Sequence, residues 1–302
     1  MYDIVIIGAG PAGLTAATYS LRAGKTVLVI EKSGFGGQVA FSPKIENFPG
    51  IVSVSGSELA ERLVEQPLEL GAETVFGEVT GIHGTPGSFT VTTKDEKYAC
   101  KAIIIASGAK HRRLNVEGED TFAGNGISYC AVCDGAFFAS QNVAIVGGGN
   151  SALQEAVLLS DICESVTIIQ NLPFLTGEAR LQEILNERKN VRIITSVTVD
   201  RLFGGEALEG AVIRHAETGE TETVSCTGLF VAIGLEPQNA AFADVVALDE
   251  QGYIIAGEDC RTSADGICAA GDCRTKSVRQ ITTAAADGAV ASVAVCRTID
   301  AL

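Results

Sequence analysis

Two cysteines and an acid carry the most specific chemistry of this chain, in the run Cys130-Ala131-Val132-Cys133-Asp134. Thiols at this spacing close a small disulfide that can be reduced and re-formed by exchange through a mixed disulfide. The attacking thiol needs a lowered pKa, which a helix N-terminus can provide. Asp134 follows closely enough to exchange protons with a thiol as a general acid or base, and a helix N-cap is its alternative role.

The same pair of cysteines has two less reactive interpretations, half of a zinc site or a structural disulfide. No second cysteine pair stands at metal spacing and the chain has 3 histidines, so the sequence favours a redox dithiol and no metal site. The chain has 9 cysteines, and we expect the others, scattered singly, to be small buried hydrophobes: Cys100, Cys163, Cys226, Cys260, Cys268, Cys273 and Cys296.

A dithiol needs an electron source, and the N-terminal segment indicates one. A buried-strand pattern over 3–7 runs into Gly8-Ala9-Gly10-Pro11-Ala12-Gly13, a helical pattern, and a second strand ending at Glu31. This is the complete dinucleotide-binding fingerprint. Gly8 allows the tight turn, Gly10 lets the backbone approach a pyrophosphate, and Gly13 lets helix and strand pack closely. Glu31, 23 residues after Gly8, is expected to accept hydrogen bonds from the adenosine ribose.

The pattern starts afresh at 142–146, where a strand leads into Gly147-Gly148-Gly149-Asn150-Ser151-Ala152, a helix and the strand 165–169. Here the residue 23 positions after Gly147 is the neutral Gln170, and residues 151–179 contain no lysine or arginine. The acid typical of NAD binding and the arginines typical of NADP binding are both missing. The second module is therefore expected to bind NAD(P)H weakly or not at all.

The remaining elements are coarser predictions. We expect a helix over 57–71 that Pro67 kinks or ends, successive strands over 74–105 ending at Ser107-Gly108, and a domain crossing near Pro237. A short strand over 266–270 should end in Gly271-Asp272, and an alanine-rich helix over 282–296 should lie close to a cofactor or another subunit. The basic run 110–113 is a hinge, a docking patch or a solvated linker.

The totals limit the class of protein. A length of 302 residues with 46% hydrophobic and 20% charged residues suits two globular domains. No apolar run reaches membrane-spanning length, and the N-terminus shows no basic leader, so we expect a cytoplasmic protein. The net charge of −15 argues against nucleic acid and anionic membranes as partners.

With these motifs in place, the chain resembles the low-molecular-weight thioredoxin reductase family over nearly its whole length. The resemblance implies a homodimeric FAD enzyme of α/β fold, with two nucleotide-binding domains that are Rossmann-like and three-layered. The second domain is inserted in the first. The FAD domain would comprise 1–112 and 241–302, and the inserted domain, 113–240, would carry the dithiol.

Carried over residue by residue, the resemblance makes Cys130, Cys133 and Asp134 catalytic, with Cys133 facing the flavin and Cys130 attacking the disulfide of thioredoxin. The residues it implies for FAD are Gly8, Gly10, Pro11, Ala12, Gly13, Glu31, Gly37, Gln38, Asn47, Ser107, Gly108, Gly271, Asp272, Arg279, Gln280 and Ile281.

The chain departs from NADPH-dependent members, which carry a histidine and arginines where this sequence has 170–176, Gln-Asn-Leu-Pro-Phe-Leu-Thr. It is therefore more similar to the ferredoxin-dependent flavin thioredoxin reductases, and reduced ferredoxin is preferred to NAD(P)H as donor. Docking of an acidic ferredoxin would need a basic patch, from Arg274, Lys276 and Arg279 or from 110–113. Three alternatives remain: an NAD(P)H-dependent thioredoxin reductase, a reductase of similar fold that ignores thioredoxin, and a non-catalytic flavin and dithiol redox sensor.

Overall fold

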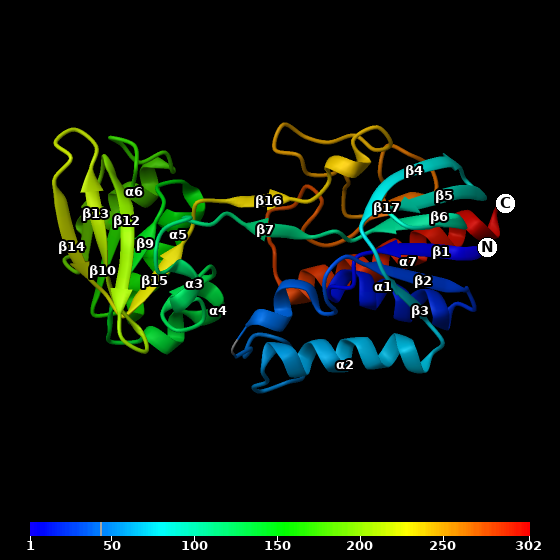
Figure 1. Ribbon diagram of the computed structural model, residues 1–302, viewed down its shortest axis with the longest axis horizontal. Coiled ribbons are helices and arrows are strands. Elements are labelled where there is room, and N and C mark those ends of the chain that lie inside the picture. The colour runs from blue at the N-terminus through cyan, green and yellow to red at the C-terminus, as the bar shows by residue number, and fades with distance from the viewer. Residues whose placement is uncertain (43) are drawn as a thin grey trace. The chain divides into compact units, whose positions relative to one another are not determined.

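The computed structural model describes residues 1–42 and 44–302, which form two compact units (Figure 1). The first comprises Met1–Lys110 and Glu236–Leu302, and the second comprises His111–Leu235. The predicted boundaries, 112/113 and 240/241, lie within five residues of these. Two short strands that pair with each other, β7 (Ala109–His111) and β16 (Leu235–Pro237), carry the chain across the boundaries. Among the described residues, no helix is long and apolar enough to cross a membrane.

The first unit is built on a seven-stranded sheet with the order β3-β2-β1-β6-β5-β4, in which β17 also pairs with β6. Parallel pairing joins β1 (Tyr2–Ile7), β2 (Val27–Glu31), β3 (Glu73–Phe76), β6 (Lys97–Ile105) and β17 (Ile267–Ala269). The strands β4 (Val79–Thr85) and β5 (Ser88–Thr93) are antiparallel additions. The central strands read as unbroken runs of branched apolar residues because both faces of the sheet are buried.

The helices of this unit are α1 (Pro11–Arg22), α2 (Gly56–Glu69) and α7 (Ile281–Asp300), with short 3-10 turns η1 (Gly37–Phe41) and η3 (Ala240–Phe242). The first and last helices lie side by side, blue against red in Figure 1. Small residues make this possible, since a Cβ added at Gly288 would lie 2.1 Å from the carbonyl oxygen of Ala12. The alanine-rich C-terminal helix therefore packs on the helix that comes after the first glycine loop.

Pro67 does not end the second helix at its own position. Proline was expected to kink or end the helix, yet α2 continues through it to Glu69. Proline lacks the N–H that would bond the carbonyl of Leu63, so the helix loses that bond and continues for only two residues. Pro67 is buried, and its carbonyl accepts the N–H of Ala72 at 2.9 Å, which closes the helix end.

The second unit repeats the plan with a five-stranded parallel sheet in the order β11-β10-β9-β15-β8. These strands are β8 (Ile127–Ser128), β9 (Asn142–Val146), β10 (Ser165–Ile169), β11 (Val191–Ile194) and β15 (Gly228–Val231). An antiparallel sheet adds β12 (Val197–Gly204), β13 (Leu208–His215) and β14 (Thr221–Ser225). The helical segments are α3 (Glu119–Phe122), α4 (Ala131–Asp134), η2 (Gly135–Phe138), α5 (Asn150–Ile162) and α6 (Ala179–Glu187). The predicted pair of Rossmann-like α/β modules is thus confirmed.

The isolated cysteines are all buried and unpaired, as predicted. Burial raises the pKa of the Cys226 and Cys268 thiols to about 12, because a thiolate is poorly stabilised in an apolar core. These seven side chains pack as small hydrophobes, and thiol chemistry is left to Cys130 and Cys133.

Candidate active site

The dithiol lies at the start of the one-turn helix α4, directly after strand β8. Cys130 and Cys133 form a disulfide with a Cα–Cα distance of 5.3 Å, and both are half-buried. Cys130 is the N-cap of α4, and the backbone N–H of Cys133 donates to its Sγ at 3.2 Å. An amide aimed at this sulfur stabilises a thiolate there once the disulfide is reduced. The geometry therefore favours Cys130 as the more acidic thiol.

Asp134 ends the same helical turn. Its Oδ2 accepts the hydroxyl of Ser128 at 2.6 Å, and burial raises the pKa of its carboxyl. It makes no side-chain cap to the following turn, so the N-cap alternative has no support in the structure. A carboxyl that holds its proton more tightly than usual beside two sulfurs is suited to supply a proton to a thiolate.

The first glycine loop has the geometry of a pyrophosphate site. Gly8 adopts φ +105°, and a Cβ there would lie 2.3 Å from the Ala106 carbonyl oxygen. A Cβ at Gly13 would lie 1.9 Å from the Gly8 oxygen, which explains both glycines sterically. At Gly10, by contrast, a Cβ would meet nothing within 4 Å, so the backbone is open to a ligand at the start of α1. Pro11 and Ala12 form the first turn of that helix.

Glu31, at the end of β2, is 7% exposed and shapes this loop. Its Oε2 accepts the N–H of Ala9 at 2.7 Å, and its Oε1 accepts those of Ser33 at 2.8 Å and Gly34 at 3.3 Å. A carboxylate oxygen accepts more than one hydrogen bond, so room remains for ribose hydroxyls. The sequence predicted that Glu31 contacts the ribose. It did not predict that Glu31 also holds the loop through hydrogen bonds to its amides.

The other residues predicted for FAD lie in five further segments of the first unit. Gly37, at φ +57°, comes within 3.4 Å of Gly10 if given a Cβ, and Gln38 beside it is exposed. The amide of Asn47 donates to Gln280 at 3.2 Å, and Gln280 caps α7, which begins at Ile281. The Asn47–Gln280 bond joins the segment around Asn47 to the start of α7.

Two more of these segments are Ser107-Gly108, at the end of β6, and Gly271-Asp272, after β17. Ser107 bonds Asn239 at 2.8 Å, and a Cβ at Gly108, φ +68°, would meet nothing within 4 Å. The Asp272 carboxyl is buried, its Oδ1 has no hydrogen-bond partner among the described residues, and burial raises its pKa. A buried acceptor without a donor carries a large cost, which a hydroxyl-rich ligand relieves.

These observations fit FAD. The open backbone at Gly10 and Gly108 leaves space for a ligand, and Asp272 supplies an acceptor that the described residues do not satisfy. The residues implied by the resemblance are thus suited to hold a dinucleotide along the carboxyl ends of β1, β6 and β17.

One part of the predicted donor-docking patch is wrong. Arg274 is 2% exposed, and its guanidinium forms bonds of 2.7 and 2.8 Å with Asp287, which Lys276 also contacts at 2.9 Å. Arg279 stacks on Tyr253, with 4.2 Å between its guanidinium carbon and the ring centre. These cations are held inside the first unit because Asp287 and Tyr253 bind them. In the basic run 110–113, by contrast, Lys110 and Arg112 are exposed.

The second glycine loop has the same backbone but different neighbours. A Cβ at Gly148 would lie 2.5 Å from Cδ of Gln170, whose amide donates to the Phe174 carbonyl at 3.3 Å. The N–H groups of Thr176 and Gly177 donate to the Gly148 oxygen at 2.8 and 2.9 Å. The segment 170–177 is thus folded against the loop and contributes no cation to it.

An acid also lies at this second loop. Asn150, the first residue of α5, accepts the N–H of Glu178 at 2.7 Å and donates to its carboxylate at 3.2 Å. A helix N-terminus normally attracts a phosphate, but a carboxylate held there repels one. The second loop therefore has a carboxylate, and no cation from 151–179, beside its helix N-terminus.

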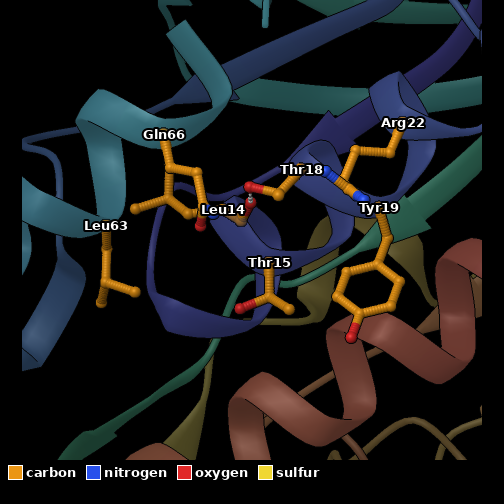
Figure 2. A pocket seen from close by; sticks show the side chains of 7 residues that line it. All are labelled: Leu14, Thr15, Thr18, Tyr19, Arg22, Leu63 and Gln66. Carbon is orange, nitrogen blue, oxygen red and sulfur yellow. Dashed lines mark hydrogen bonds between the residues drawn. The ribbon is translucent and has the colours of Figure 1, made fainter. Parts of the chain in front are cut away.

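A hollow in the first unit, of about 220 Å³, lies between α1 and α2 (Figure 2). It is lined by Leu14, Thr15, Thr18, Tyr19, Arg22, Leu63 and Gln66. None of these is among the residues predicted for FAD, so this hollow is separate from the flavin site. Across the described parts of the chain, no group of three or more histidine, cysteine or acidic side chains is arranged to hold a metal ion.

Sequence reasoning missed two buried acids, Asp287 and Glu119, and the half-buried Glu155. Asp287 fixes Arg274 and accepts the N–H of Gly271 at 2.9 Å. Glu119 accepts the N–H groups of Leu114 and Asn115 and the hydroxyl of Tyr129, the residue before the dithiol. Glu155 lies on α5 beside α4. Only an alignment of related sequences or the fold itself distinguishes such acids from surface ones.

A dinucleotide loop in one unit and a redox disulfide on a second Rossmann-like unit define a flavin-dependent disulfide oxidoreductase. The model of the pyridine nucleotide-disulphide oxidoreductase family matches residues 2–288. Within that class, the chain belongs to the low-molecular-weight thioredoxin reductase family, and FAD is its cofactor.

Two curated relatives and one solved structure support the assignment. Thioredoxin reductase of Listeria monocytogenes is 40% identical over 292 residues, 96% of this chain and 92% of the relative. That of Treponema pallidum is 38% identical over 302 residues, 100% and 98% of the two chains. The crystal structure of thioredoxin reductase from Streptococcus pyogenes matches with a TM-score of 0.95 at 38% identity, covering 100% of this chain and 99% of the other. These names specify no electron donor, and they do not indicate the ferredoxin-dependent branch of the family.

Proposed function

We propose that this chain reduces the disulfide of thioredoxin through Cys130 and Cys133, with FAD held by the first unit. The observation that carries the proposal is the disulfide at the start of α4, with the amide of Cys133 aimed at Cys130 Sγ. The names of the relatives, thioredoxin reductases that match almost end to end, support thioredoxin as the substrate.

Held by the residues of the first unit described above, the flavin in its reduced form would supply the two electrons with which the Cys130–Cys133 bond breaks into two sulfur groups. The Cys130 thiolate then attacks the disulfide of thioredoxin, forming a mixed disulfide and releasing one substrate thiolate. Cys133, as a thiolate, attacks Cys130 Sγ, which releases the second substrate thiolate and re-forms the enzyme disulfide. Asp134, buried beside Ser128, holds a proton that the departing or arriving sulfur can take.

The dithiol assignment is tested by Cys130→Ser and Cys133→Ser in the holoenzyme, with turnover of thioredoxin measured under chemical reduction of the flavin. Both variants should lose turnover, while Cys163→Ser, the same change at a buried thiol of the same unit, should keep it. Turnover by either dithiol variant would refute the proposal. A wild-type disulfide that responds to reductant without any turnover would favour the redox sensor instead.

We further propose that reduced ferredoxin, and not NADPH, supplies electrons to the flavin. Support comes from the second glycine loop, where Gln170 lies against Gly148, Glu178 is bonded to Asn150, and 151–179 carry no lysine or arginine. After the correction of the Arg274 patch, the exposed cations of the predicted run are Lys110, Arg112 and Arg113, of which Arg113 is paired with Asp120.

The donor is identified by anaerobic flavin spectroscopy with NADH, NADPH and reduced ferredoxin added separately. Rapid bleaching by ferredoxin alone is expected. Bleaching by either nucleotide at micromolar concentration would overturn this part and leave an NAD(P)H-dependent thioredoxin reductase.

A homodimer is also proposed, by the same resemblance. Apolar side chains on the outer faces of α1 and α7 are exposed, Tyr19 at 48%, Val290 at 40% and Val293 at 44%, and they line a common groove with Arg297. A partner surface would cover them. The molecular mass measured by light scattering should be twice that of the chain, and Val293→Glu should halve it.

A further inference from the structure

A buried carboxyl lies against the dithiol turn and has no role in the mechanism above. Glu155 projects from α5, and the backbone N–H of Ala131, the first residue of α4, donates to its carboxylate. Its Oε2 is buried with no hydrogen-bond partner among the described residues. Burial raises the pKa of this carboxyl to about 7. An acid in this setting changes its protonation state in the physiological range.

A Rossmann-like fold does not require an acid at the position of Glu155. The equivalent position in the first unit, 8 residues after the first glycine of the loop, is Ala16, which is fully buried. The two helices come after the same kind of loop and face the same kind of sheet. A carboxyl at Glu155 therefore reflects the element that packs against α5 in the second unit, and that element is the dithiol turn.

Two acceptors share the amides of this single turn. Cys130 Sγ takes the N–H of Cys133 at 3.2 Å, and the Glu155 carboxylate takes the N–H of Ala131, the residue next to Cys130. When the disulfide is reduced, a thiolate at Cys130 brings a negative charge to the turn. An ionised Glu155 brings a second one, and like charges on buried neighbours disfavour each other.

We propose that Glu155 takes up a proton when the Cys130–Cys133 disulfide is reduced and releases it when the disulfide re-forms. Two electrons enter, the S–S bond breaks, one sulfur is protonated and the other remains a thiolate. The second proton goes to Glu155 from solvent. Glu155 is thus a positioning residue that acts through the amides of α4, and it makes the dithiol a weaker reductant at low pH. The inference rests on the proposed redox role of the dithiol.

Other charged groups around Glu155 do not replace it. The segments packed on α5 are α4, η2, β9, β10 and α6. The turn α4 contributes the two cysteines and Asp134, which is bonded to Ser128, while η2, β9 and β10 contain no charged residue. The charged residues of α6 and the acid of α5 itself are exposed: Arg180, Glu183, Glu187 and Asp161. None of these side chains is a cause of the raised Glu155 pKa.

The test is the pH dependence of the dithiol potential in the FAD-loaded protein, between pH 6 and 8. The protein is equilibrated in dithiothreitol redox buffers, quenched in acid and alkylated. The reduced fraction of the peptide holding Cys130 and Cys133 is then measured by mass spectrometry. Each additional proton bound per two electrons steepens the potential by about 30 mV per pH unit. The wild type should be steeper near pH 7 than Glu155→Gln by up to that amount.

Two further variants make the result unambiguous. Glu155→Ala installs the residue found at the equivalent place of the first unit and should have the same shallow slope as Glu155→Gln. Glu183→Gln, an equal charge change at an exposed site of α6, should keep the wild-type slope. Equal slopes in the wild type and both Glu155 variants would overturn the inference. If the peptide fails to reduce at any potential, or reduces without turning over thioredoxin, the proposed function fails instead.

Discussion

The two glycine loops of this chain share one backbone and differ in what their neighbours do. Gly8 and Gly147 both come after the first strand of a Rossmann-like unit and both have positive φ, +105° and +137°. In the first loop, Glu31 accepts the surrounding amides and leaves the backbone at Gly10 open. In the second, Gln170 lies on Gly148 and Glu178 holds the helix start.

The difference shows that a glycine fingerprint specifies a turn and not a ligand. Strand, turn and helix form in both units because the same steric requirements hold. The residues after the second strand differ, and with them the hydrogen bonds and the charge that surround each loop. Four sets of variants test this contrast between the loops, in order of decreasing effect.

The largest effect is expected at the acid position. Glu31→Ala leaves the buried N–H of Ala9 without an acceptor and the Ser33 and Gly34 amides bonded only to water, so the unit should be destabilised by about 1–3 kcal/mol and lose flavin. Gln170→Ala removes one weak bond and should cost about 0.5–1.5 kcal/mol with flavin retained. Urea unfolding and the flavin absorbance after gel filtration measure both. Equal losses in the two variants would contradict the contrast.

The next effect separates ligand binding from folding. A Cβ fits at Gly10 without a contact, and at Gly149 it meets only the Thr176 hydroxyl at 3.7 Å, so both alanine variants should fold. Gly10→Ala should weaken FAD by about 1–3 kcal/mol, roughly 5- to 150-fold, because the methyl group occupies the approach of the pyrophosphate. Gly149→Ala should leave FAD affinity unchanged. Unchanged FAD affinity in Gly10→Ala would contradict the placement of the FAD pyrophosphate at this loop.

A gain of function tests the absence of arginines beside the second glycine loop. Asn171 and Leu172 are exposed, so Asn171→Arg with Leu172→Arg places two cations beside the second loop. Flavin reduction by NADPH should rise roughly tenfold at low salt, since charge-assisted bonds to the phosphate form, and the gain should fade as salt is added. NADH, which lacks the 2′-phosphate, is the control and should show no such gain. A glutamine pair at the same positions separates charge from bulk.

The smallest effect on the flavin concerns the helices after the loops, where Ala16 faces its core and Glu155 faces the dithiol turn, and it is read as a change of stability with pH. The Glu155 pKa is raised from its ordinary 4.5 to about 7, so the folded protein binds more protons than the unfolded chain between these values. Stability from this group is therefore present at low pH and is lost as pH rises through that window. Since one pKa unit corresponds to about 1.4 kcal/mol, Glu155→Gln should be more stable than wild type at pH 8 by up to about 3 kcal/mol. At pH 4.5 the two should match in chemical unfolding; a constant difference would contradict the shift.

The sequence was sufficient where chemistry depends on local spacing. Gly8, Gly13 and Glu31 occupy fixed positions around one turn, and Cys130 and Cys133 form the disulfide because three residues of separation allow it. It was insufficient where a partner lies far along the chain. Arg274 looked like a surface cation until Asp287, on another element, was seen to bind it, and Glu155 looked like any polar helix residue.

The close packing of α7 on α1 has a consequence for the order in which this protein is made. The last strand and helix complete the sheet and core that begin at Tyr2, whereas His111–Leu235 is one continuous stretch. On the ribosome, the N-terminal segment emerges first yet lacks β17 and α7 until synthesis is nearly finished. The inserted unit has all its strands earlier and is able to fold before the first unit is complete. A truncation before Ile267 should therefore leave a protease-resistant dithiol unit attached to an unfolded N-terminus.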